Sequence, residues 1–272
     1  MREVILLTFF FFVVSLFSLY LGLLTKEAIL RGEIEPLFPN PSSYANSFYL
    51  LLMVLIGSAL LLTLIRIKIT LVRVVENVSL FFLISTTFSY FLPSSISFLL
   101  AFVLVILSEL RPSFLLKNIC LLLSIPSASA LVGASLDFKV LLLFFSILAL
   151  YDILSVALTK HMVYIAENLM SRPTALISVF PSTKVRKVSF TSRKKKMKII
   201  ALGAGDYFMT SSFCVSLLSL GIKHALLSLV FNTFAIFFLF SRLIRKDVAR
   251  PLPALPFLLF SSLCALLVSF YL

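Results

Sequence analysis

Charged side chains are scarce in this sequence of 272 residues. Asp, Glu, Lys and Arg make up only 13% of it, whereas 61% of the residues are hydrophobic and the mean hydropathy is +1.13. A typical soluble domain has roughly a quarter charged and half apolar residues. The chain therefore lacks the polar surface of a soluble enzyme, a disordered chain or a secreted disulfide scaffold. It predicts a polytopic membrane protein, and the abundance of Leu and Phe favours helical spans over barrel strands.

Cysteine is also rare. The three residues of this type, Cys120, Cys214 and Cys264, lie inside apolar runs. Their spacing fits neither a metal site nor a disulfide framework, so we interpret them as small buried side chains. Lys160 and His161 are predicted to end a span at the interface, and nothing near them has metal-ligand spacing. We expect no metal and no cofactor.

The apolar runs divide the chain into spans of about 20 residues, the length that crosses a bilayer. Residues 77–108 carry no charge, but one helix of that length would measure roughly 48 Å, too long for a hydrocarbon core of about 30 Å. The turn-forming sequence Pro93-Ser94-Ser95 divides this run into a hairpin. We therefore predict an all-α polytopic membrane protein with a polar loop at 26–41. Its nine transmembrane helices lie at about 4–24, 46–65, 69–91, 94–110, 115–136, 140–159, 199–218, 225–241 and 253–271.

The basic residues predict the orientation of these helices. With the N-terminus in the cytoplasm, twenty of the 24 Lys and Arg lie inside and four outside, as the positive-inside rule requires. We expect one integral membrane domain in three parts: helices one to six in 1–169, a basic cytoplasmic loop at 170–198 and helices seven to nine in 199–272, with the C-terminus outside. The net charge of +13 is then a topology signal that also attracts anionic lipid heads, with no role in binding nucleic acid. The basic run at 193–196 is interpreted as a stop at the lipid surface.

Two acids lie where charge is costly. Nine of the eleven carboxylates lie in predicted loops or at span ends, but Asp152 and Asp206 lie inside spans six and seven. An ionisable side chain there costs at least about 2.5–3.5 kcal/mol, which indicates a function. Each acid is eight residues from a basic residue at the cytoplasmic end, Lys160 or Lys198, or roughly 12 Å along a helix. Two antiparallel neighbouring helices would therefore carry these acids at the same level.

Two carboxyls at close range in a low dielectric cannot both ionise easily, so they would share one proton. The ionised carboxyl can then take a proton from water, while the protonated one donates to the carbonyl of a peptide bond. Paired acids also serve proton-coupled transporters and leak channels. The acids alone leave protease and transporter equally open.

Three short motifs favour the protease. They are Tyr151-Asp152, Gly203-Ala204-Gly205-Asp206 and Pro253-Ala254-Leu255. In this order, on helices six, seven and nine, they resemble those of the presenilin and signal peptide peptidase family of intramembrane aspartyl proteases, in particular its small archaeal or microbial presenilin homologues. The resemblance covers about 139–272, and the nine-helix plan extends it over the whole chain. It implies a catalytic pair, Asp152 and Asp206, with supporting residues Tyr151, Gly203, Ala204, Gly205, Pro253, Ala254 and Leu255.

The supporting residues have physical roles that agree with this resemblance. Gly203 and Gly205 allow a close approach of backbones, either to a substrate or, as the alternative, between packed helices. The prolines from residue 251 to 256 either break the helix beside a cavity or mark a plain helix start. Tyr151 is expected to pack or to form a hydrogen bond beside the pair. We also expect a water-filled cavity open to the cytoplasm near Asp152, Asp206 and Leu255.

The sequence thus predicts an intramembrane aspartyl endopeptidase that hydrolyses peptide bonds within transmembrane segments of membrane proteins, using two Asp side chains and a water. Its expected partners are these segments and the lipid bilayer, and its oligomeric state is left open. A prepilin-type peptidase is the remaining alternative, because it also carries Gly-x-Gly-Asp. It would lack the Pro-Ala-Leu segment and would cut beside the membrane.

Overall fold

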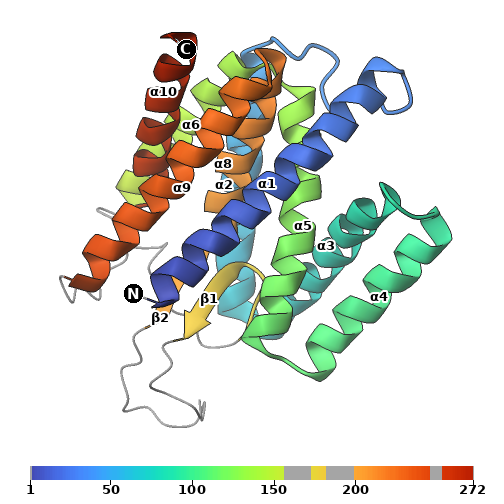
Figure 1. Cartoon of the computed structure of the whole chain (residues 1–272). Helices are drawn as coiled ribbons and strands as arrows, with labels where there is room; N and C mark the ends of the chain where they lie inside the picture. Colours follow the sequence, from blue (N-terminus) through green and yellow to red (C-terminus); the bar gives the residue numbers. More distant parts are fainter. Residues whose placement is uncertain (1, 156–172, 182–198, 246–252, 272) are drawn as a thin grey trace.

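The computed structural model describes residues 2–155, 173–181, 199–245 and 253–271. This part of the chain forms nine α-helices, a short 3-10 turn (Leu217–Ser219) and a two-stranded sheet (Figure 1). Lys160, His161 and the basic run at 193–196 lie outside it. The helices are α1 (Arg2–Leu30), α2 (Ala45–Ile67), α3 (Ile69–Ser89), α4 (Ser94–Leu110), α5 (Phe114–Ser135), α6 (Phe138–Leu154), α8 (Ala204–Ser216), α9 (Ile222–Arg245) and α10 (Leu255–Tyr271). The strands are β1 (Ile177–Pro181) and β2 (Ile199–Gly203).

The helices confirm the predicted class of fold, a polytopic helical membrane protein. Each predicted span overlaps one of the described helices, and α3 and α4 form the predicted hairpin around Pro93. Among the described helices, α1, α2, α3, α5 and α9 are long and apolar enough to cross a membrane, while α4 and α10 are shorter apolar helices. The number of helices that cross the bilayer stays a prediction.

The first helix is longer than predicted. It continues to Leu30, well beyond the expected span at 4–24 and into the loop expected at 26–41. Glu27 and Arg31 form an ion pair one turn apart, which supports the extra turn. Gly32 then ends the helix at φ 72°, a left-handed conformation that glycine adopts without steric cost. The charged residues that suggested a loop therefore belong to an emerging helix end.

The prediction of the seventh helix was wrong in its first five residues. Residues 199–203 form β2, which pairs antiparallel with β1 from within the predicted loop at 170–198, and the helix begins only at Ala204. Ile199 and Ile200 are β-branched, and β1 supplies hydrogen-bonding partners that an isolated strand in the membrane would lack. The side chain of Asn118 on α5 bonds both the N–H and the C=O of Val179, at 3.3 and 3.1 Å. This contact closes the outer edge of β1 at that residue.

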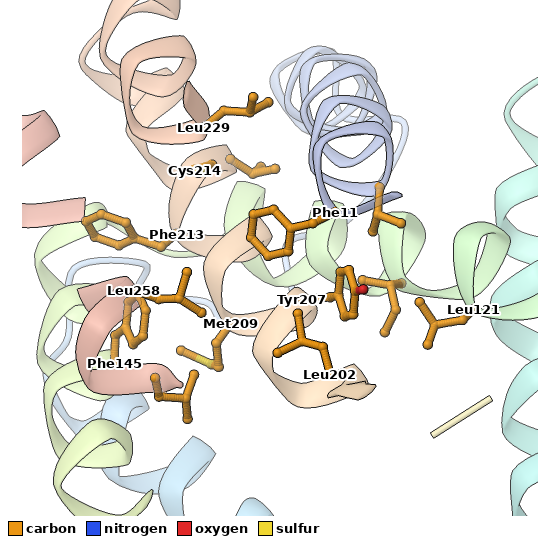
Figure 2. Packing of buried hydrophobic residues seen from close by; sticks show 14 of the residues in the cluster. Phe11, Leu121, Phe145, Leu202, Tyr207, Met209, Phe213, Cys214, Leu229 and Leu258 are labelled. Atoms are coloured by element: carbon orange, nitrogen blue, oxygen red, sulfur yellow. The ribbon is translucent and has the colours of Figure 1, made fainter. Parts of the chain in front are cut away.

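The core lies where α1, α5 and α8 meet. Helix α1 crosses the bundle and contacts α5, α8 and α9 (Figure 1). A Cβ on Gly133 of α5 would lie 2.5 Å from the Ser212 carbonyl oxygen and 2.6 Å from the Val215 Cβ, so glycine permits this close packing. In Figure 2, Phe11 of α1, Leu121 of α5 and Leu202 of β2 lie around Tyr207. The start of α8 is therefore anchored in the best-packed part of the molecule.

Candidate active site

Asp152 lies in the last described turn of α6, with only 7% of its surface exposed. Its carboxylate accepts a hydrogen bond from the backbone N–H of Leu255. Leu255 is the first residue of α10, and the first N–H groups of a helix have no partner within that helix. The carboxylate thus accepts a hydrogen bond from one of these free donors and lies at the positive end of the helix dipole. The Pro-Ala-Leu segment therefore contacts the acid of the Tyr-Asp motif directly.

Asp206 is held by the start of its own helix. Gly203 is the N-cap of α8, and Asp206, in the first turn, accepts a hydrogen bond from the Gly203 N–H. This is the reach-back bond that an acidic side chain makes in a capping box. Asp206 as a whole residue is partly buried.

The two acids lie near each other. The charge of Asp152 acts on the carboxyl of Asp206, and helices α6, α8 and α10 contact one another pairwise. The three motifs found in the sequence therefore converge on one site. The predicted distance of Asp206 from Lys198 along a continuous helix was wrong. Residues 199–203 are extended, and each rises about 3.3 Å rather than the 1.5 Å of a helix.

The remaining residues of the motifs surround this pair. The N–H of Ala204 bonds the C=O of Leu176, just before β1. Pro253 and Ala254 precede α10 outside any regular helix, and the C=O of Ala254 accepts the first hydrogen bonds of that helix. The segment thus interrupts helical structure and also begins α10, so the two interpretations of it are compatible. Tyr151 is half-buried and packs against the core, and whether it assists the pair stays a prediction.

The glycines of the second motif do not pack against a neighbouring helix in the described part of the chain. A Cβ on Gly205 would meet nothing there within 4 Å, and one on Gly203 would meet only Asp206 Oδ2, at 3.3 Å. Gly205 is also exposed. Within the described part of the chain, the geometry therefore disfavours the helix-packing interpretation of these glycines.

Gly205→Ala separates these two interpretations. Because its new methyl group has room, we expect the variant to fold with an unchanged melting temperature while its cleavage rate falls about tenfold, since a misplaced substrate loses proximity. Thermal unfolding and a cleavage assay on the same preparation measure both quantities. Gly57→Ala, also in open space but on α2, is the matched control for the loss of a glycine. A lowered melting temperature with normal cleavage would contradict this role for Gly205.

Two features of the described structure were not predicted. Tyr207, directly after Asp206, is fully buried, and its hydroxyl bonds Ser178 Oγ of β1 at 2.7 Å, which fastens α8 to the strands. Glu76 and Lys117, expected near water or in a cytoplasmic segment, are 4% and 1% exposed and form an ion pair. Tyr207 could have been noticed as the neighbour of an acid in a membrane span. The sequence carries no signal that brings Glu76 and Lys117 together.

No group of three or more His, Cys, Asp or Glu side chains suited to a metal is found within the described ranges. The expectation that the protein needs no metal or cofactor stays a prediction. Fold and site together define a helical membrane protein with two interacting carboxyls at the meeting point of three helices.

The comparisons with known proteins agree with this class. The family model described as "Signal-peptide peptidase, presenilin aspartyl protease" matches residues 8–272. The chain therefore belongs to this family, and it is an intramembrane aspartyl protease acting on membrane proteins within the bilayer. The prediction made from the three motifs is confirmed at this level, which leaves the transporter and prepilin-peptidase alternatives without support.

Solved structures show the same fold. Two structures of a presenilin family intramembrane aspartate protease, in the C222 and P2 space groups, match with TM-scores of 0.68 and 0.66. They are 18% and 20% identical to this chain and cover 98% and 96% of it, with the same shares of their own chains. No curated protein sequence matches at a significant level.

Proposed function

We propose that Asp152 and Asp206 are the catalytic pair of this protease. The observation that carries the proposal is the convergence of the two carboxyls with the Leu255 N–H of the Pro-Ala-Leu segment. One proton is shared between the acids. The ionised carboxyl takes a proton from a water molecule as that water attacks the peptide carbon, and the protonated carboxyl donates to the carbonyl oxygen. Proton transfer to the leaving nitrogen then releases the two peptides.

A helical substrate must unwind before water can attack it, because its amides are hydrogen-bonded within the helix. Val179 and Ala201 face each other across the sheet, and Asn118 bonds the Val179 groups that point away from β2. The N–H and C=O of Ala201 consequently point away from β1, and no partner for them is found among the described residues. An unwound substrate segment can pair along this edge of β2, close to Gly203 and Asp206.

The orientation in the membrane follows from charge and geometry together. We propose that the N-terminus and the segment 170–198 face the cytoplasm and the C-terminus faces outside. The start of α1 and the end of α10 lie at opposite ends of the bundle (Figure 1), which supports this arrangement. Contacts of α1 with α8 and α9 support a single integral membrane domain, whose three parts we place at 1–169, 170–198 and 199–272.

The proposal is tested by incubating the purified protein, in lipid vesicles, with a panel of single-span substrates of both orientations. We expect the wild-type protein to release fragments whose masses place the cleaved bond inside the span, and Asp206→Ala to release none. A control without enzyme identifies spontaneous hydrolysis. Fragments released equally by Asp206→Ala would contradict the assignment of this residue.

A further inference from the structure

Four charged side chains gather between α3, α4 and α5, away from the two aspartates. Lys117 of α5 is almost fully buried, and its Nζ lies 3.3 Å from Glu76 Oε1 on α3 and 2.9 Å from Glu109 Oε1 on α4. It also lies 3.5 Å from the side-chain oxygen of Asn77. Arg73 adds its positive charge near Glu109, so the two acids and two bases balance. A buried ion pair of this kind is weak evidence for stability, which makes its other contacts informative.

Those other contacts lead to the strands. Glu76 Oε2 accepts a hydrogen bond from Thr174 Oγ1 at 2.9 Å, and Glu76 Oε1 accepts one from the Ala175 N–H at 2.8 Å. Thr174 and Ala175 lie just before β1, separated from it by Leu176, and both are buried. The Glu76 carboxylate therefore binds the backbone of the segment that leads into the sheet, while Lys117 contacts the same Oε1 that accepts the Ala175 N–H.

The connection continues to the start of α8. The next residue, Leu176, donates its N–H to the Thr174 hydroxyl oxygen at 3.2 Å. The C=O of Leu176 accepts a hydrogen bond from the N–H of Ala204 at 2.9 Å. Ala204 is the first residue of α8, two positions before Asp206. Three consecutive residues, 174–176, thus link the Glu76 carboxylate to the helix turn that carries this acid. Asn118, next to Lys117, fixes the same strand at Val179.

We propose that Glu76, held by Lys117, is a positioning residue for Asp206: it fixes the place at which α8 begins relative to α3 and α5. Hydrogen bonds to a charged acceptor are stronger than those to a neutral one, so the ionised carboxylate fixes the backbone of Ala175 more firmly than an amide would. A small displacement of Asp206 matters because both carboxyls must reach one water. The inference rests on the proposed catalytic role of Asp206.

The test replaces the Glu76–Lys117 pair by apolar side chains of similar size. Glu76→Leu combined with Lys117→Met removes both charges of the buried pair together, while Glu109, which also pairs with Lys117, is 34% exposed and keeps the positive charge of Arg73 nearby. We expect this variant to melt modestly below the wild-type temperature, because the buried Ala175 N–H loses its acceptor. Its kcat should fall about tenfold or more and its KM should stay within about twofold, because misplacement by about 1 Å affects the chemical step. Hydrogen exchange at Ala175 and Ala204 should become faster, while exchange in α9 stays unchanged.

Thr174→Val provides a second variant should the double variant fail to fold. It alters no charge and keeps the shape of the side chain, but it removes the hydroxyl that joins Glu76 to the Leu176 N–H. We expect a several-fold lower kcat with unchanged KM, because one link of the connection is lost while the Ala175 bond remains. Glu33→Gln, at an exposed carboxylate just after α1, is the control and should behave as wild type.

The outcomes distinguish this inference from the proposed function. A wild-type kcat in the folded Glu76→Leu/Lys117→Met variant overturns the positioning role. If that double variant does not fold, a wild-type kcat in Thr174→Val overturns it. Asp206→Asn with full activity instead overturns the catalytic assignment on which it rests. A loss of stability without any change in kcat would show that the pair serves folding alone, and it would also overturn the positioning role.

Discussion

Asp152→Asn is expected to lower kcat for peptide cleavage by about 10²–10⁴-fold, the usual contribution of a general acid or base. Asn has the shape of Asp, and its side-chain oxygen can still accept the Leu255 N–H, so the fold should persist. An amide can neither take a proton from water nor share one with Asp206. Quantifying fragments from a single-span substrate measures the loss. A transition-state mimic that requires the shared proton should also bind the variant more weakly.

Asp137→Asn is the matched control for this change. Asp137 is the N-cap of the same helix, and its side chain accepts the Lys139 N–H; Asn caps a helix about as well as Asp. This variant should cleave at the wild-type rate. Intact cleavage by Asp152→Asn would refute the two-carboxyl mechanism, and an ion flux that disappears in the same variant would favour a transport role for the acids.

Lys117→Met alone is expected to have the largest effect on stability. The side chain is buried and lies between two carboxylates, so its removal leaves the negative charge of Glu76 in the core without the ammonium group that faces it. Removal of one partner from a buried pair costs about 3–5 kcal/mol. We expect a clearly lower melting temperature in detergent, measured by thermal unfolding.

Lys223→Met is the control for the loss of a lysine, because Lys223 is exposed at the start of α9. It should melt as the wild type does. Adding Glu76→Leu to Lys117→Met should restore most of the lost stability, because the remaining buried charge is removed with it. An unchanged melting temperature for Lys117→Met would mean that the ion pair contributes nothing to the folded state.

Much of the fold could be predicted because the membrane restricts the choices. Hydrophobic length located the helices, including the hairpin at Pro93, and the scarcity of charge made Asp152 and Asp206 stand out. The motifs carried the family assignment, which the family model confirms over residues 8–272. These features depend on local composition and order along the chain, which a single sequence displays directly.

The parts that could not be predicted depend on contacts between distant residues. The apolar run at 199–203 is compatible with a helix or a strand, and only pairing with residues 177–181 decides for the strand. Glu76 and Lys117 lie near predicted span ends, where charge usually reaches water or marks topology. Their burial arises from the packing of α3, α4 and α5, for which hydrophobic length gives no indication.

The most direct test of the account joins the two positions chemically. With Cys120, Cys214 and Cys264 replaced by Ser, the variant Asp152→Cys/Asp206→Cys is treated in membranes with a short thiol-specific cross-linker. Leu150→Cys/Asp206→Cys serves as the control, because Leu150 is 62% exposed on the same helix. We expect efficient cross-linking of the first pair and little of the second. If neither pair is cross-linked, the result would contradict the proximity of the two aspartates.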